Sequence, residues 1–81
     1  MYTPVNDPVA VRVHFDKNKI TPLSFKWGNH WYEELKTNLI FHARQGAKIF
    51  TYFSIDDGVN YFKLMLNNQT LEWTLVETGI T

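Results

Sequence analysis

Three hydrophobic runs separated by turn signals make up the second half of the chain. Residues 49–55 and 59–66 are joined by Asp56-Asp57-Gly58, and residues 71–77 follow Asn67-Asn68-Gln69. A glycine after aspartate supplies the positive φ that a tight hairpin turn requires. The pattern therefore predicts an antiparallel meander for this half.

Alternation of apolar and polar residues predicts two more strands in the first half. The first strand begins at residue 9, after an extended segment of residues 1–8 that shows no periodicity. Its buried face is expected to carry four residues: Val9, Val11, Val13 and Phe15. After a polar turn at 16–19, Pro22 stands at the start of the second strand, where its missing N–H is tolerated. That strand is expected to bury Leu23, Phe25 and Trp27.

Residues 30–45 fit either two strands or a helix. As a helix, the segment carries an i, i+4 stripe that ends before Gly46, formed by Trp31, Leu35, Leu39 and Ala43. As strands, it turns back at Gly28-Asn29, and Leu39, Phe41 and Ala43 begin a fourth strand. We favour strands because Thr37 and Asn38 are poor helix formers. A short helix within 30–45 is the alternative.

These elements predict an all-β fold: a strongly twisted antiparallel meander of six or seven strands, partly closed like a small barrel. The single domain is expected to span residues 9–78, with a tail at 79–81. Both faces of the 49–66 hairpin are apolar, and barrel closure hides only one of them. The second face predicts an interaction surface, unless a helix at 30–45 covers it within the monomer. Its expected anchors are Phe50, Tyr52, Tyr61 and Met65, with a polar rim of Arg44, Lys48 and Lys63.

Composition narrows the class of protein. The 81 residues are 44% hydrophobic and 16% aromatic, enough for one dense core. The chain has no cysteine, no apolar stretch of membrane-spanning length and no signal-like start, so a cytoplasmic protein without a membrane partner is expected. Eight basic residues balance eight acidic ones, whereas duplex-binding proteins carry a positive excess. A neutral protein with an exposed apolar patch favours self-association.

The chemistry-bearing residues predict no enzyme, cofactor or metal. The three histidines, His14, His30 and His42, lack the spacing that presets a metal site. Ser24 and Ser54 have no base at a recognisable spacing, and the four glycines are too scattered for a phosphate loop. We therefore expect a binding or assembly module that forms a homodimer or docks another protein. The alternative is a single-stranded nucleic-acid-binding domain, with stacking rings and a cation supplied by Trp27, Trp31, Tyr32 and Lys26.

Three segments also resemble a known family. They are the opening strand Pro8-Val9-Ala10-Val11-Arg12-Val13, the hairpin Phe25-Lys26-Trp27-Gly28-Asn29-His30-Trp31-Tyr32, and Asp57-Gly58-Val59-Asn60-Tyr61-Phe62-Lys63-Leu64 followed by Thr70-Leu71-Glu72-Trp73-Thr74-Leu75. Together they resemble a small all-β bacterial domain of unknown function, found alone or appended to relatives of Y-family DNA polymerases. Where that family is rich in arginine, this chain has Asn29-His30. The resemblance implies the fold and no catalytic residues.

Overall fold

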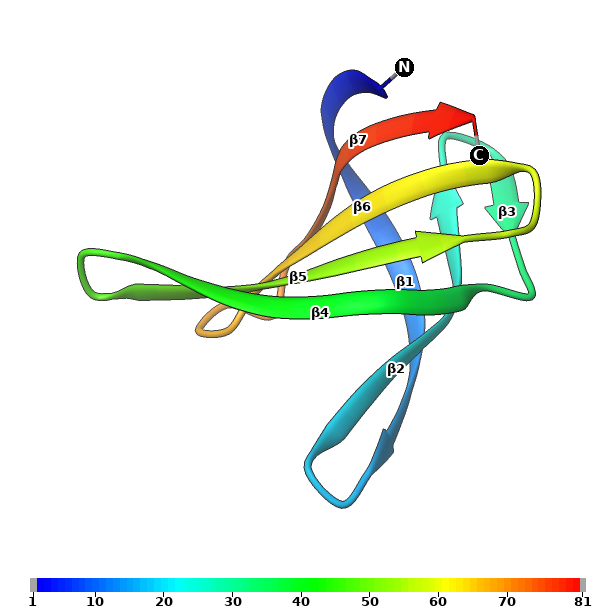
Figure 1. The fold of residues 1–81 in the computed structure, drawn as a ribbon. Coiled ribbons are helices and arrows are strands. Elements are labelled where there is room, and N and C mark those ends of the chain that lie inside the picture. The colour runs from blue at the N-terminus through cyan, green and yellow to red at the C-terminus, as the bar shows by residue number, and fades with distance from the viewer. Residues whose placement is uncertain (1, 81) are drawn as a thin grey trace.

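Short turns set the strand boundaries in the computed structural model, which describes residues 2–80. Gly28 and Gly46 have φ of +63° and +61° at the first position of two-residue turns, and Lys17-Asn18 form a third such turn with φ of +49° and +70°. These values suit the primed turns that join twisted strands. Seven strands result: β1 Tyr2–Asp16, β2 Lys19–Trp27, β3 His30–Tyr32, β4 Lys36–Gln45, β5 Lys48–Asp56, β6 Asn60–Asn67 and β7 Trp73–Ile80 (Figure 1).

All seven strands belong to one antiparallel sheet in the order β3-β2-β1-β7-β6-β5-β4. Two meanders, β1–β3 and β4–β7, are joined where β1 pairs with β7. The all-β meander is thus confirmed, and residues 30–45 form strands, not a helix. None of the described residues forms a helix that could cross a membrane.

The expected partial closure into a barrel is not observed. Strands β3 and β4 are the two edges of the sheet, and no ladder joins them within residues 2–80. They are neighbours in sequence, linked by residues 33–35, in which Glu34 has φ of +55°. β3 pairs with β2 over only three residues, and the chain then begins β4 at the opposite edge of the sheet. The sheet therefore curls without closing.

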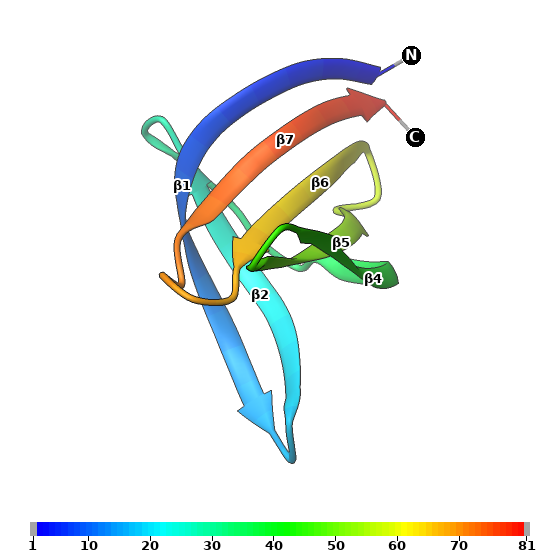
Figure 2. The same cartoon turned by 90° about the vertical axis from the view of Figure 1, so that its left-hand side faces the viewer.

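The first eight residues are not a separate lead-in. β1 begins at Tyr2, pairs with β7 as far as Val9 and then pairs with β2 from Ala10 onward. A register shift between Pro4 and Asp7, with Asn6 at φ of +59°, bends the strand. Figure 2 shows β1 curving along β7 so that the two ends of the described chain lie side by side. The expected C-terminal tail likewise continues β7 as far as Ile80.

The core lies where the curled sheet brings β2 and β3 against β6. Phe62 contacts the rings of Phe25 and Tyr32, with centroids 4.9 Å apart in both pairs, although β1 and β7 separate β2 from β6 in the sheet. Ring contacts across two intervening strands require a concave inner face. The buried hydrophobic residues are Phe25, Phe53, Ile55, Phe62, Leu64, Leu66 and Leu75.

Two residues expected in the core, Phe15 and Leu23, are exposed, and so is Leu71 at the start of the last hydrophobic run. Phe15 is 68% exposed because the β1–β2 hairpin extends beyond the core, as Figure 1 shows. Leu23 is 50% exposed because it is the extra residue at a register shift, where Arg12 pairs with Ser24 and Val13 with Pro22. Leu71 is 66% exposed with φ of +64° and belongs to the turn before β7. The expected burial therefore fails near the end of a hairpin, at a bulge and in a turn.

Two carboxylates organise the β5–β6 turn. Oδ1 of Asp57 accepts hydrogen bonds from the backbone N–H groups of Val59 (3.0 Å) and Asn60 (2.7 Å). Asp56 accepts from the side chain of Asn38 (2.7 Å) and from the N–H of Gly58 (3.0 Å). The bond from Asn38 is the largest cause of a lowered pKa at Asp56. Desolvation raises the pKa of Asp57, but the bonds from Asn60 and Val59 outweigh it and lower the pKa overall.

Because of Asp56 and Asp57, we expect the folding stability of the protein to decrease at low pH. A carboxyl with a lowered pKa in the folded state binds a proton less readily there than in the unfolded chain. Its stabilisation is complete above the unfolded pKa of about 3.9 and is lost as pH falls through the folded value. Thermal unfolding between pH 7 and pH 2.5 should show a melting temperature that decreases once the pH is lowered past about 4. In Asp56→Asn/Asp57→Asn the fall should be smaller, and an unchanged pH profile would contradict this role.

Candidate interaction surface

The predicted surface residues lie together on the outer face of the sheet, opposite the core. On β5 and β6 the buried residues Phe53, Ile55, Phe62 and Leu64 alternate with half-buried ones that point outward. The outward set includes all four expected anchors: Phe50, Tyr52, Tyr61 and Met65. Alternation along the two strands is enough to place them on one face.

Register links these anchors across four strands. Phe41 of β4 is opposite Tyr52 of β5, which is opposite Met65 of β6 and then Thr74 of β7. The rings of Phe41 and Tyr52 stack with centroids 4.9 Å apart and planes only 8° from parallel. At the other end of the face, Tyr61 contacts Tyr2 of β1 at 4.7 Å. We call this surface the aromatic face: Tyr2, Leu39, Phe41, Phe50, Tyr52, Tyr61 and Met65.

Three members of the aromatic face were missed as anchors in the sequence, and they are its most exposed residues. Tyr2 is 60% exposed, Leu39 57% and Phe41 38%. Leu39 and Phe41 alternate in the stretch that also fits a helix, so their side of the sheet depended on forming β4. Tyr2 lies in a segment without periodicity, and only its pairing with Gly79 of β7 brings it beside Tyr61.

The expected basic rim divides into two places. Lys48 is exposed on the β4–β5 hairpin at one end of the aromatic face, whereas Arg44 pairs with Ile49 and lies on the opposite face, so the expectation for Arg44 is wrong. Lys63 lies within the face, where its Nζ is 3.9 Å from Oε1 of Glu77 and 6.0 Å from the centroid of the Phe41 ring. The centre of the aromatic face therefore carries one positive and one negative side chain next to each other.

The residues proposed for stacking bases do not form one platform. Trp27 and Tyr32 pack against the core, and Nε1 of Trp27 donates to Asp7 Oδ2 at 3.0 Å. Trp31 lies opposite Lys26 in the β2–β3 ladder, and the Arg12 guanidinium covers its ring at 4.3 Å. Two of the three rings thus face inward, while the third is in contact with an arginine.

The histidines lie on three different strands. His14 is on β1, His30 on β3 and His42 on β4, and residues 2–80 hold no group of three His, Asp or Glu side chains arranged for a metal. Nδ1 of His42 lies 2.9 Å from Oγ1 of buried Thr51, whose hydroxyl donates to Oδ1 of Asn68 at 2.9 Å. Because a hydroxyl has one hydrogen, Thr51 must accept from an Nδ1–H of His42. In an activated nucleophile the hydroxyl would instead donate its hydrogen to the imidazole. The two bonds therefore have a structural role here, because they join β4, β5 and the β6–β7 turn.

No family model, no curated protein and no solved structure is significantly similar to the chain. The resemblance to a bacterial domain of unknown function stays a prediction carried by the residues quoted above, and the aromatic face must be interpreted from its own geometry.

Proposed function

We propose that this protein is a non-enzymatic assembly module that self-associates through the aromatic face. The observation that carries the proposal is the stacked pair Phe41–Tyr52, which lies outward on the sheet beside the 57%-exposed Leu39. Aromatic residues concentrated in one outward patch are typical of protein interfaces. A partner covering this patch removes apolar area from water at about 25 cal/mol per Å².

A second copy of the chain is the occupant that the charges of this face favour. A twofold interface requires a patch that is complementary to itself. Lys63 and Glu77 lie side by side within the face, so two copies can place each lysine near the glutamate of the other. The whole chain has a formal net charge of zero, which leaves no overall repulsion between copies.

Two further parts of the proposal concern the cellular compartment and the alternative of nucleic-acid binding. We place the module in the cytoplasm because the chain has no cysteine. Single-stranded nucleic-acid binding receives less support from the geometry, because Trp27 and Tyr32 pack inward and Arg12 covers Trp31. A neutral chain also supplies little of the charge that drives such binding.

We expect Leu39→Lys to weaken the dimer about tenfold or more. Leu39 is exposed in the monomer, so its replacement costs little folding stability, but it places a charge in the dimer interface twice because of the twofold symmetry. Sedimentation equilibrium or light scattering after size exclusion, over a concentration series at 0.15 M salt, measures the dissociation constant.

Leu71→Lys is the matched control. Leu71 is 66% exposed in the β6–β7 turn, and the substitution makes the same chemical change away from the aromatic face. It should leave the dissociation constant unchanged. A wild-type protein that stays monomeric at high micromolar concentration, or equal weakening by both substitutions, refutes self-association through this face.

A further inference from the structure

Two strand edges in this sheet lack a neighbour and face the same space. β4 pairs only with β5, and β2 pairs with β3 only through Phe25–Trp27. The edge of β2 at residues 19–24 and the edge of β4 are therefore both unpaired with any strand among residues 2–80. Unpaired edges present backbone groups that an added strand can use.

The turns determine which backbone groups point into this space. Gln45 and Lys48 flank the two-residue turn at Gly46-Ala47, so they form a hydrogen-bonded pair, and every second pair along β4 and β5 does the same. The residues between them, Ile40, His42 and Arg44, direct N–H and C=O away from β5. By the same reasoning from the Lys17-Asn18 turn, Ile20 directs its groups away from β1.

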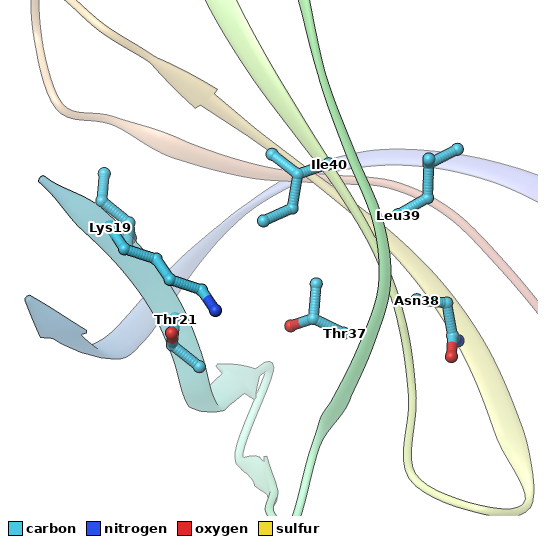
Figure 3. A pocket seen from close by; sticks show the side chains of 7 residues that line it. Lys19, Thr21, Thr37, Asn38, Leu39 and Ile40 are labelled. Atoms are coloured by element: carbon cyan, nitrogen blue, oxygen red, sulfur yellow. The ribbon is translucent and has the colours of Figure 1, made fainter. Parts of the chain in front are cut away.

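Two adjoining hollows lie between the edges. One, of about 340 Å³, is lined by residues 19–21 of β2 and 37–40 of β4. The other, of about 270 Å³, shares Lys19, Ile20 and Ile40 with it and extends to Phe53. Figure 3 shows Ile40 and Thr37 pointing toward β2, and Lys19 pointing toward β4. Ile40 is 39% exposed although it lies opposite the buried Phe53 in the ladder, so the core is open on this side.

An unpartnered hydroxyl marks the same place. Oγ1 of Thr37 is buried and has no hydrogen-bond partner, and in Figure 3 it points from β4 toward β2. A buried polar group without a partner costs about 1–3 kcal/mol, so its presence at a functional surface needs a reason. A strand added between β2 and β4 supplies a backbone group that can become the missing partner of this hydroxyl.

Charges along the two edges have one sign. Residues 19–24 of β2 and 36–45 of β4 include Lys19, Lys36 and Arg44 but no Asp or Glu. Lys36 and Lys19 have Asp56 and Asp16 as cross-strand neighbours, whereas Arg44 is opposite the apolar Ile49. The aspartates balance the two lysines, so the uncompensated charge along the edges is that of Arg44, which favours a ligand with a carboxylate.

We propose that the slot between β2 and β4 binds an extended acidic peptide segment of a partner protein as an added strand. Main-chain hydrogen bonds to Ile40, His42 and Arg44 supply affinity, and alternate side chains enter the hollows against Ile20 and Ile40. A second folded copy does not fit, because its own β4 carries β5 along the other edge and β2 bounds the slot. This site is separate from the aromatic face and stands independently of self-association.

Peptide selection with two variants at one position tests the slot. Random twelve-residue peptides displayed on phage are selected on the immobilised protein, and the enriched peptide is titrated by fluorescence polarisation. His42→Ala removes the imidazole but keeps the backbone N–H, whereas His42→Pro removes both. We expect selected peptides to alternate apolar and acidic residues, and His42→Pro to bind about tenfold more weakly than His42→Ala. Circular dichroism checks that both variants fold.

Amide hydrogen exchange gives the second measurement. On peptide binding, the amides of Ile40, His42 and Arg44 should exchange more slowly, while those of Leu39 and Phe41, already bonded to β5, should change little. The slot is refuted if no peptide is enriched or if both His42 variants bind equally. It is refuted too if the bound peptide protects the aromatic face instead.

Discussion

Phe62→Ala is expected to remove most of the folding stability of this protein. The ring is 1% exposed and contacts Phe25 and Tyr32, so it joins β6 to β2 and β3 across the concave face. Truncating a buried phenylalanine costs about 3–5 kcal/mol. An 81-residue domain has only roughly 0.05–0.15 kcal/mol per residue to lose. Urea unfolding followed by tryptophan fluorescence should show a midpoint lower by about 2–5 M, since m is about 1–1.5 kcal/mol/M for a small domain.

Phe50→Ala makes the same substitution on the opposite face. Phe50 is half-buried and points outward, so its loss leaves no cavity in the core and should cost about 1 kcal/mol. Comparing the two variants separates the effect of losing the contact between β6 and the β2–β3 part of the sheet from the general effect of losing an aromatic ring. Equal losses for the two variants would show that Phe62 does not hold the curled sheet together.

Replacing residues 2–7 with a glycine–serine segment of equal length is expected to destabilise the fold by at least about 4 kcal/mol. The segment pairs with β7 from Tyr2↔Gly79 to Asp7↔Leu75, and each glycine placed in a strand costs about 0.5–1 kcal/mol more to order. Val5 also packs on the core, and Asp7 accepts the Trp27 indole N–H. Thermal unfolding and amide exchange along β7 measure the loss.

Tyr2→Ala/Thr3→Ala serves as the control, because it removes two exposed side chains and keeps the backbone of the ladder. Its stability should stay within about 1 kcal/mol of the wild type. If the glycine–serine replacement is equally mild and β7 amides exchange as before, residues 2–7 are not part of the sheet in solution.

Local signals in the sequence were sufficient for the hairpins. Gly28, Gly46 and Gly58 all have positive φ, as the predicted turns require. Alternation in 49–66 predicted which residues of β5 and β6 face the core, and hence that Phe50, Tyr52, Tyr61 and Met65 share the outer face. These features depend on neighbours within a few residues, where turn geometry and the two-residue period of a strand decide the outcome.

The predictions from the sequence were wrong where the structure of a segment depends on residues far away in the chain. Residues 2–8 have no periodicity of their own and become a strand because β7, about seventy residues later, pairs with them. Phe15 and Leu71 have strand-like patterns but lie beyond the core, where no second layer covers them. Alternation predicts the face of the sheet on which a side chain lies. Whether that side chain is buried depends on what packs against the face in the folded protein.

The sequence by itself determined the hairpin turns, most of the strands and the existence of two apolar faces, because turn residues and side-chain alternation act locally. Only the tertiary structure decided that β1 joins the two meanders, that Tyr2 and Leu39 extend the aromatic face, and that β2 and β4 leave a slot between them. Pairing between distant strands depends on how the whole sheet twists and curls. An unpaired edge is the absence of such a pairing, and no local pattern encodes it.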